Sequence, residues 1–427
     1  MSKELCGENK KILIHTLVFS PDGVSTAYLY NNIALKFKDA GYKVVVLTTT
    51  PHYNAVESEL KKQPLKKKLF GLYYESDFKG IKVKHVYQKK YKSTIRRLFG
   101  FVYWHLVSFI LALCEKKVGL ILSPSPPLTI GFLNVLIAKL KSTKVIYNVQ
   151  EIYPDLLIEE GGLKLGLAIS FLKWMEKFIY NHSDAVTTID QIFYETIKSR
   201  FKDKTKLHII PNFVDTEIYK PLPKKNLELS KDLFPDTESV KMMYAGNIGH
   251  AQYWDPLIAL AEELKNDSVE FFVIGEGAEK ERLLREKEDR KLEKLHIIPY
   301  QPKELMPSLL AYSDVQFIFM APETEGLGFP SKVYTIMACE KPLIVCSGEN
   351  TPIINFLRDK DCAFLMTNKD LQTNVAKMTE ILRNTPLSEF ERMGKNGYAN
   401  IANNYSKENV TGMYVDLVKS LLDKKMS

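Results

Sequence analysis

The stretch from Glu325 to Lys332, EGLGFPSK, gathers residue types that suit the binding of an anion. Gly326 and Gly328 permit tight backbone geometry, Pro330 suits a first helical turn, and Lys332 falls in that turn. The start of a helix offers main-chain amides, and a lysine beside them adds positive charge. The spacing therefore indicates an anion site, the alternative being an ordinary helix start with a solvated lysine.

Two glycine-containing loops each follow an apolar run. GNIG, from Gly246 to Gly249, has glycines where a backbone can approach a ligand closely, although an ordinary strand-to-helix turn would look the same. GEG, from Gly275 to Gly277, lacks the further glycine and lysine of a Walker loop and lacks the full dinucleotide fingerprint. These loops therefore indicate a nucleotide pocket that is neither a Walker-type phosphate site nor a dinucleotide site of the usual fingerprint.

The first half offers acids and a turn. Glu151 and Asp155, in QEIYPD, can hold hydroxyl groups or position a reaction, or they can be structural caps; both interpretations stay open. The neighbouring Gln150 cannot act as a general base. The turn SPDG, from Ser20 to Gly23, ends the first apolar run and is expected beside the active site.

Short β-branched runs alternate with helical stretches through both halves, which predicts two α/β domains with doubly wound parallel sheets. Ligands bind at the carboxyl ends of such strands, so a cleft between two facing sheets is the expected active site. We predict a basic, acceptor-binding domain over 1–213, a nucleotide-binding domain over 214–400, and a final helical segment over 401–427 that returns to the first domain.

Composition limits the classes of function. The chain has 427 residues and a net charge of +8, and residues 1–215 hold 32 Lys and Arg against 19 Asp and Glu. Charge alone allows nucleic acid or anionic lipid as a partner, but no nucleic-acid motif accompanies it. The five cysteines are scattered and no secretory leader is evident, so we expect a cytoplasmic protein without a disulfide framework or metal site.

The positive charge concentrates in residues 61–97, which contain thirteen Lys and Arg against only Glu75 and Asp77. The apolar run 98–114 follows directly, and it is short for a membrane-spanning helix. It predicts a helix buried in the domain. The alternative is a helix in the membrane interface, with Tyr103 and Trp104 at headgroup level.

An ordered set of motifs resembles a known family. In the second half they are PNFVDTEIYKP (211–221), YAGNIG (244–249), FVIGEGAEKERL (272–283) and GFPSKVYTIMACEKPLIV (328–345). In the first half they are FSPDGVSTA (19–27), TTTPHYN (48–54), SPSPPL (123–128) and NVQEIYPDL (148–156). Together they resemble retaining glycosyltransferase family 4, which has the GT-B fold of two Rossmann-like domains facing across a cleft. The most similar branch is that of O-antigen and capsule enzymes typified by fucosaminyltransferases.

The resemblance implies roles for individual residues. It places catalytic or positioning roles on Glu151, Asp155 and Glu325, and acceptor contacts on Pro21 and Gly23. It implies donor contacts at ten positions: Gly246, Asn247, Gly249, Gly275, Gly277, Tyr300, Gly328, Ser331, Lys332 and Glu349. No metal or cofactor is required beyond the nucleotide sugar, expected to be UDP-linked.

The chain departs from the family pattern at three places. No Arg or Lys follows the first glycine loop, which places more weight on Lys332. Thr335 stands where the family's second glutamate holds the ribose, and Glu349 is the predicted substitute. Gln150 stands where a histidine is frequent.

The resemblance implies transfer of an N-acetylated hexosamine or 6-deoxy sugar, with retention, from a nucleoside diphosphate to a lipid-linked glycan precursor. The acceptor would be built on undecaprenyl diphosphate at the inner face of the membrane, for a surface polysaccharide. Two other readings stay open: a nucleotide-sugar 2-epimerase on the same fold, and a non-catalytic nucleotide-sugar-binding subunit.

Overall fold

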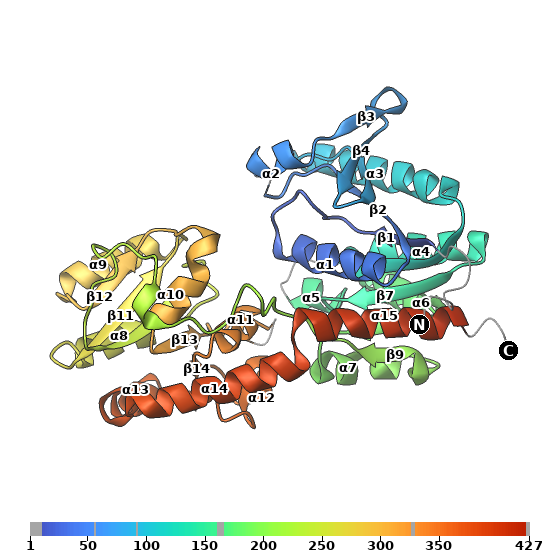
Figure 1. Ribbon diagram of the computed structural model, residues 1–427. Helices are drawn as coiled ribbons and strands as arrows, with labels where there is room; N and C mark the ends of the chain where they lie inside the picture. The colour runs from blue at the N-terminus through green and yellow to red at the C-terminus, as the bar shows by residue number, and fades with distance from the viewer. Residues whose placement is uncertain (1–10, 55–56, 91–92, 160–165, 326–328, 424–427) are drawn as a thin grey trace, which may run out of the picture. The chain divides into compact units, whose positions relative to one another are not determined.

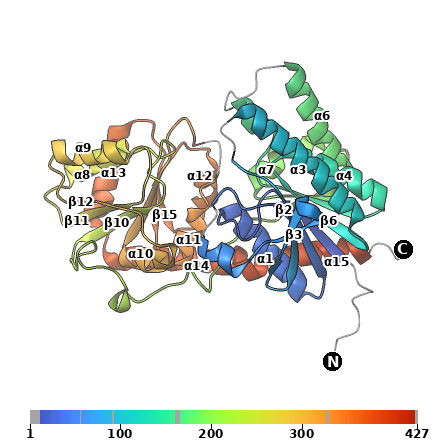
Figure 2. The same ribbon diagram turned by 90° about the horizontal axis from the view of Figure 1, so that it is seen from above.

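The computed structural model describes residues 11–54, 57–90, 93–159, 166–325 and 329–423, and the chain divides into two compact units (Figures 1 and 2). Unit 1 runs to Asn212 and includes the C-terminal segment from Glu408, and unit 2 spans Phe213–Lys407. The predicted C-terminal segment 401–427 divides between the units. Ile401 packs in a core of unit 2, and the part from Glu408 belongs to unit 1.

Unit 1 contains a nine-stranded sheet in the order β3–β4–β5–β2–β1–β6–β7–β8–β9. The strands are β1 Lys11–His15, β2 Lys43–Thr49, β3 Lys66–Lys68, β4 Tyr73–Phe78, β5 Ile81–Val86, β6 Val118–Ser125, β7 Lys144–Val149, β8 Ala185–Thr188 and β9 Leu207–Ile209. All neighbours are parallel except at the β3–β4–β5 edge. This antiparallel edge lies in the lysine-rich stretch, where β5 alternates the buried Ile81, Val83 and His85 with the exposed Lys82 and the half-buried Lys84.

Helices cover both faces of this sheet. Helices α1 (Ser25–Asp39) and α15 (Lys407–Asp423) lie on one face, and α3 (Thr94–Cys114), α4 (Leu128–Lys141) and α6 (Gly166–His182) lie on the other (Figure 2). The shorter elements are α2 Glu57–Lys62, α5 Asp155–Glu159, α7 Gln191–Ile197, η1 Leu69–Gly71, η2 Lys198–Arg200 and η3 Lys204–Lys206. The apolar side chains between these layers form the core of unit 1.

Unit 2 contains a parallel six-stranded sheet in the order β12–β11–β10–β13–β14–β15. Its strands are β10 Val240–Ala245, β11 Val269–Ile274, β12 Leu295–Ile298, β13 Val315–Phe319, β14 Leu343–Cys346 and β15 Ala363–Met366. Its helices are α8 Asp255–Glu263, α9 Lys280–Asp289, α10 Met306–Tyr312, α11 Lys332–Ala338, α12 Pro352–Leu357, α13 Leu371–Asn384 and α14 Leu387–Asn404, with η4 Lys224–Asn226 and η5 Lys303–Leu305. The strands are buried on both faces, as parallel strands usually are.

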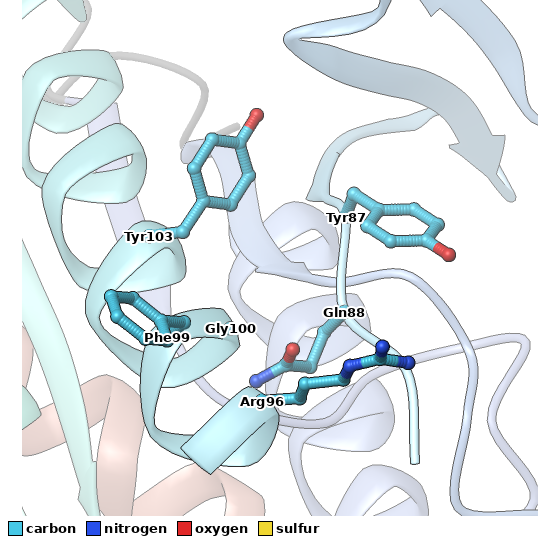
Figure 3. Close-up of a pocket in the computed structure, with 6 residues that line it drawn as sticks. All are labelled: Tyr87, Gln88, Arg96, Phe99, Gly100 and Tyr103. Carbon is cyan, nitrogen blue, oxygen red and sulfur yellow. The ribbon is translucent and has the colours of Figure 1, made fainter. Parts of the chain in front are cut away.

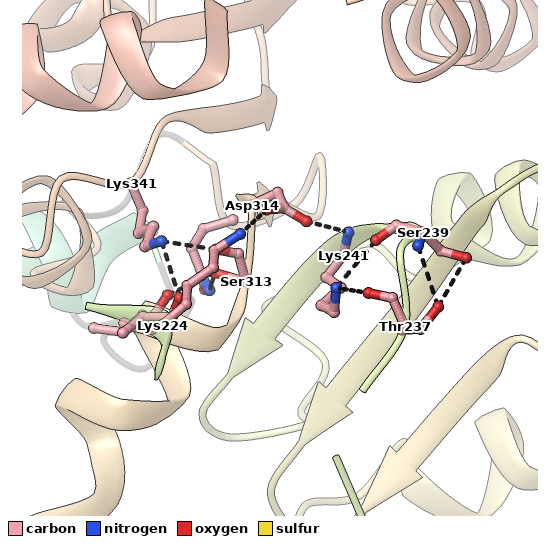
Figure 4. Close-up of polar contacts among 10 residues, drawn as sticks. Lys224, Thr237, Ser239, Lys241, Ser313, Asp314 and Lys341 are labelled. Carbon is pink, nitrogen blue, oxygen red and sulfur yellow. Dashed lines mark hydrogen bonds and ion pairs between the residues drawn. The ribbon is translucent and has the colours of Figure 1, made fainter. Parts of the chain in front are cut away.

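Several lysines of unit 2 form hydrogen bonds and an ion pair at the amino-terminal edge of its sheet (Figure 4). The Asp314 carboxylate accepts from the Lys241 main-chain N–H at 2.8 Å and pairs with Lys224. The Lys341 Nζ donates to the Ser313 carbonyl at 2.8 Å, and the Lys241 Nζ donates to the Thr237 carbonyl at 2.6 Å. These lysines therefore hold the start of β10 and β13.

The prediction of two Rossmann-like α/β domains is confirmed. In each sheet the order in which successive strands are added reverses between two central, parallel neighbours, β1 and β6 in unit 1 and β10 and β13 in unit 2. Ligands of open α/β sheets bind at the carboxyl ends of the strands beside such a reversal. The loops that follow these four strands are therefore the expected location of the functional site.

Candidate functional site

The two glycine loops of unit 2 are bonded to each other by their main chains. The Gly246 N–H donates to the Ile274 carbonyl at 2.9 Å, and the Ile248 N–H donates to the Glu276 carbonyl at 2.8 Å. The Glu279 N–H returns to the Ile248 carbonyl at 3.0 Å. The loops after β10 and β11 thus form one rigid floor at the carboxyl edge of the sheet.

Glycine is required where these loops touch. Gly275 and Gly277 have φ of +149° and +157°, which side chains disfavour. A Cβ on Gly275 would lie 1.9 Å from the Gly246 carbonyl oxygen, and one on Gly277 would lie 2.1 Å from the Ile248 carbonyl oxygen. Their primary role is therefore the close contact between the two loops.

The Lys332 side chain reaches from the start of α11 to the neighbouring strand β10, at the point where the strand order reverses. It is the first residue of α11, after β13, yet its Nζ lies 3.7 Å from the centre of the Tyr244 ring on β10. Nζ also donates to the Ala245 carbonyl at 3.3 Å, and a Cβ on Gly246 would lie 2.6 Å from it. The lysine therefore places its charge at the first glycine loop, where the sequence lacks a basic residue.

Burial lowers the pKa of Lys332 to about 7. In the described part of the chain its Nζ has a carbonyl and an aromatic ring as neighbours and forms no ion pair. Other cations at this edge are already paired, Lys280 with Glu276 at 2.7 Å and Arg358 with Glu349 at 2.6 Å. Lys332 is thus the cation best placed to respond to a bound anion.

The start of α11 offers fewer main-chain donors than the sequence indicated. The Val333 and Tyr334 N–H groups donate to the carbonyls of Pro330 and Ser331 at 3.0 and 3.2 Å, because the turn is tight. Ser331 is exposed at the helix start, and Gly328 lies outside the described residues. We therefore expect the Lys332 side chain to contribute more to anion binding than the main-chain N–H groups at the start of α11.

Glu325 and Glu349 have intramolecular partners. The Glu325 carboxylate accepts from the Gly348 N–H at 2.6 Å and the Ser347 hydroxyl at 3.3 Å, so it joins the loops after β13 and β14. Glu349 is exposed, and Arg358 donates to its carboxylate and its carbonyl. Glu325 acts here as a positioning residue, and a ribose-binding role for Glu349 would require it to leave Arg358.

Tyr300 and Asn247 lie at the rim of this edge. Tyr300 follows β12 and is 66% exposed. Asn247 is exposed, and its carbonyl accepts from the Tyr244 hydroxyl at 2.8 Å. Trp254 donates to the Gly249 carbonyl at 3.1 Å, which fixes the far end of the loop before α8. No local pattern marks Tyr244, because its contact with Lys332 joins segments 88 residues apart.

In unit 1, Asp22 organises the loop after β1. Its buried carboxylate accepts from the main-chain N–H groups of His52, Tyr53 and Asn54 at 3.0, 2.9 and 2.7 Å. Gly23 is exposed and its N–H donates to the Asn54 carbonyl, whereas its predicted acceptor-site partner Pro21 is buried. Asp22 was missed in the sequence, where it looked like an ordinary turn residue.

We expect Asp22→Ala to lower the free energy of unfolding of unit 1 by about 3 kcal/mol, because three main-chain donors of one loop lose a charged acceptor. Asp22→Asn keeps one carbonyl oxygen and should lose less. Denaturant unfolding monitored by circular dichroism measures both. Wild-type stability of Asp22→Asn would show that the carboxylate charge contributes nothing, and wild-type stability of Asp22→Ala would contradict the assignment of Asp22 to this loop.

Asp155 is part of a structural ion-pair network. Arg200 pairs with Asp155 and with the buried Glu176, and burial raises the pKa of Glu176 to about 7. Of the two interpretations of Asp155, this pairing favours the structural one, since Arg200 occupies its carboxylate. Glu151 is exposed after β7, and its carbonyl accepts from the Ser125 hydroxyl at 3.2 Å.

Gln150, beside Glu151, joins a polar network under the carboxyl edge of unit 1. Its amide donates to the Asn148 side chain at 2.8 Å, and Asn148 in turn contacts the Tyr30 and Tyr414 hydroxyls at 2.6 and 2.9 Å. Helices α1 and α15 are thereby tied to β7. Among the described residues, no group of three His, Cys, Asp or Glu side chains is arranged to hold a metal ion.

The chain matches two family models, one in each half. Residues 27–218 match Glycosyltransferase Family 4, and residues 226–400 match Glycosyl transferases group 1. The chain thus carries a glycosyltransferase domain in each half, and its two units have the GT-B fold.

Among curated proteins, the chain is similar to two that are named as glycosyltransferases. It is 21% identical to the putative colanic acid biosynthesis glycosyl transferase WcaI of Escherichia coli, over 77% of this chain and 81% of WcaI. It is 25% identical to the probable glycosyltransferase WbjE of Pseudomonas aeruginosa, over 47% of this chain and 50% of WbjE. The chain thus spans about half the length of WbjE.

Solved structures share the fold. Sucrose-phosphate synthase from Thermosynechococcus elongatus has a TM-score of 0.69 at 13% identity, covering 97% of this chain and 100% of that one. Anabaena Alr3699/HepE, solved in complex with UDP and glucose, has a TM-score of 0.66 at 13% identity, covering 96% and 100%.

Proposed function

We propose that the protein transfers a sugar from a nucleoside diphosphate, with retention of anomeric configuration, to a lipid-linked glycan precursor at the cytoplasmic face of a membrane. The donor is expected to carry UDP and an N-acetylated hexosamine or a 6-deoxy sugar. The single observation that carries the proposal is Lys332, whose partly buried Nζ lies against the first glycine loop at the reversal point of the unit 2 sheet.

The chemistry asks the protein to stabilise a leaving diphosphate. As the bond between the anomeric carbon and the phosphate oxygen breaks, negative charge grows on the diphosphate, and a fixed cation nearby lowers the barrier. The acceptor oxygen bonds to the anomeric carbon on the same face, and its proton passes to the departing diphosphate oxygen. No enzyme nucleophile is needed in this scheme, and the chain's task is positioning and charge stabilisation.

Two further facts support a nucleotide donor and a glycan acceptor. HepE, which shares the fold, was solved with UDP and glucose, and WcaI is named for colanic acid biosynthesis. The loop held by Asp22 lies at the equivalent reversal point of unit 1, where an acceptor would meet main-chain groups such as those of Gly23.

Donor binding should be coupled to proton uptake. A bound diphosphate favours protonated Lys332 and raises its pKa from about 7, so the affinity for UDP should fall as the pH rises above that value. The fall is at most about tenfold per pH unit. Titration calorimetry of UDP in two buffers of different ionisation enthalpy measures the proton uptake. A pH-independent affinity would remove the lysine from the diphosphate site.

The proposed activity is tested by incubating the protein with UDP-, GDP- and dTDP-sugars, with and without a membrane lipid extract. Transfer of label into the lipid fraction supports the proposal if nuclear magnetic resonance shows that the product has the same anomeric configuration, α or β, as the donor. Isomerisation of UDP-N-acetylglucosamine without an acceptor would identify an epimerase instead. Donor binding with neither transfer nor hydrolysis would identify a binding subunit.

A further inference from the structure

One side of helix α3 is apolar and exposed. Its exposed residues recur at helical spacing: Ile95, Leu98, Phe99, Val102, Leu106 and Ile110. Phe99 is 71% exposed and Leu106 is 61% exposed. The helix is long and apolar enough to cross a membrane by length and composition alone, but its other side packs into unit 1. It therefore lies along the surface of the unit.

Trp104 belongs to the packed side of α3. It is fully buried, so the interpretation that placed it at headgroup level is wrong. Two residues along a helix correspond to about 200°, which puts Trp104 opposite the exposed Val102. Helix α3 is thus buried on one side only: that side packs in the core, as the first interpretation predicts, and the other side is exposed.

The exposed apolar surface continues onto the neighbouring helices. Helices α3, α4 and α6 form one layer on the same face of the sheet (Figure 2). On α6, Leu167 is 89% exposed, and the exposed Phe171 and Trp174 stack with ring centres 5.7 Å apart. Leu140 of α4 is also exposed. We call this outer surface the α3–α4–α6 face.

The charged side chains on these three helices are almost all basic. Their basic residues are Arg96, Arg97, Lys139, Lys141, Lys173 and Lys177. Their only acidic residue is Glu176, which is buried and paired with Arg200. An apolar surface rimmed by cations and without an exposed acid is complementary to a bilayer that contains anionic lipids.

A pocket of about 500 Å³ opens at the start of the apolar stripe (Figure 3). The rings of Tyr87, Phe99 and Tyr103 line it, together with the Arg96 guanidinium. Rings beside a cation suit the phosphate and upper chain of a lipid headgroup. The Tyr103 hydroxyl also donates to the Leu72 carbonyl at 3.4 Å, which ties α3 to the hairpin of β3 and β4.

We propose that the α3–α4–α6 face docks on a bilayer through its apolar side chains, with Arg96 and its pocket holding the headgroup of an anionic phospholipid. The proposal deepens the proposed function and rests on it, because a lipid-linked acceptor is presented at a bilayer surface. A second copy of the chain is the less suitable occupant, since two such faces would bring unopposed cations together.

The test uses the purified full chain and flotation with vesicles of phosphatidylcholine alone or mixed with phosphatidylglycerol. We expect binding to the mixed vesicles, and at least a tenfold loss of binding in the variant Leu98→Gln/Phe99→Gln/Leu106→Gln. Arg96→Gln/Arg97→Gln should weaken binding to the mixed vesicles only. Met413→Gln, which changes an exposed apolar residue of α15 on the opposite face of the sheet, should bind like the wild type.

Unchanged flotation in the triple variant, or no flotation of the wild type, would overturn the proposal. A dimer in solution that the triple variant dissociates, without vesicle binding, would assign the face to a second copy and overturn it as well. UDP binding and donor hydrolysis, measured without lipid, report on unit 2. If the wild-type protein neither binds UDP nor hydrolyses a donor, the proposed function is contradicted. If it does both but fails to float with the vesicles, only the docking is contradicted.

Discussion

Replacing Lys332 with methionine is expected to lower kcat/KM for sugar transfer by about 100- to 1000-fold, because the leaving diphosphate loses its partly buried cation. The fold should survive the change. In the folded chain the pKa of Lys332 is about 7, well below its ordinary value, so burial of the charged form costs stability. Methionine removes that cost, and the gain should be largest below about pH 7 and vanish near pH 10.

Lys341 is the matched control. It is also buried in unit 2, with its pKa lowered to about 8 by burial, but it donates to the Ala311 and Ser313 carbonyls at the amino-terminal edge of the sheet. Lys341→Met should leave the turnover of the folded protein unchanged. Steady-state kinetics and thermal unfolding across pH measure both variants. Equal kinetic losses in the two would contradict the assignment of Lys332 to the donor.

Gly275→Ala is expected to destabilise unit 2 by about 3 kcal/mol or more and to abolish UDP binding. The added Cβ would lie 1.9 Å from the Gly246 carbonyl oxygen, and both partners are backbone, so the two loops must separate. The residue also has a φ of +149°, which alanine disfavours. Denaturant unfolding and calorimetry with UDP measure the two effects.

Gly249→Ala tests whether this result is specific. A Cβ there would meet only the Asn247 side-chain amide, at 2.6 Å, and that group can rotate away. The loss of stability should stay below about 1 kcal/mol. If Gly249→Ala were as damaging as Gly275→Ala, close backbone contact between the loops would not be the reason for the glycines.

Much of the fold was predictable because its signals are local. The runs KVIYNV and VEFFVI are short and apolar, and they fold as the buried strands β7 and β11. The glycines of GNIG and GEG follow two such strands, as in any sheet of this class. The antiparallel β3–β4–β5 edge was missed, because lysines there outweighed the alternation of Ile81 and Val83.

The partners of the site residues were not predictable, because they depend on strand order. Asp155 meets Arg200 across 45 residues, and no local pattern in the sequence marks that pairing. Asp22, missed as a turn residue, is paired with a loop thirty residues later.

The sequence by itself determined that two α/β sheets form, that their loops carry glycine, and that a lysine starts α11. Only the tertiary structure decided how Lys332 reaches the first glycine loop, over the Tyr244 ring, and which side of α3 stays open. The reason is physical: periodicity and backbone preference act within one element, whereas parallel crossovers bring β13 beside β10 and the three outer helices together.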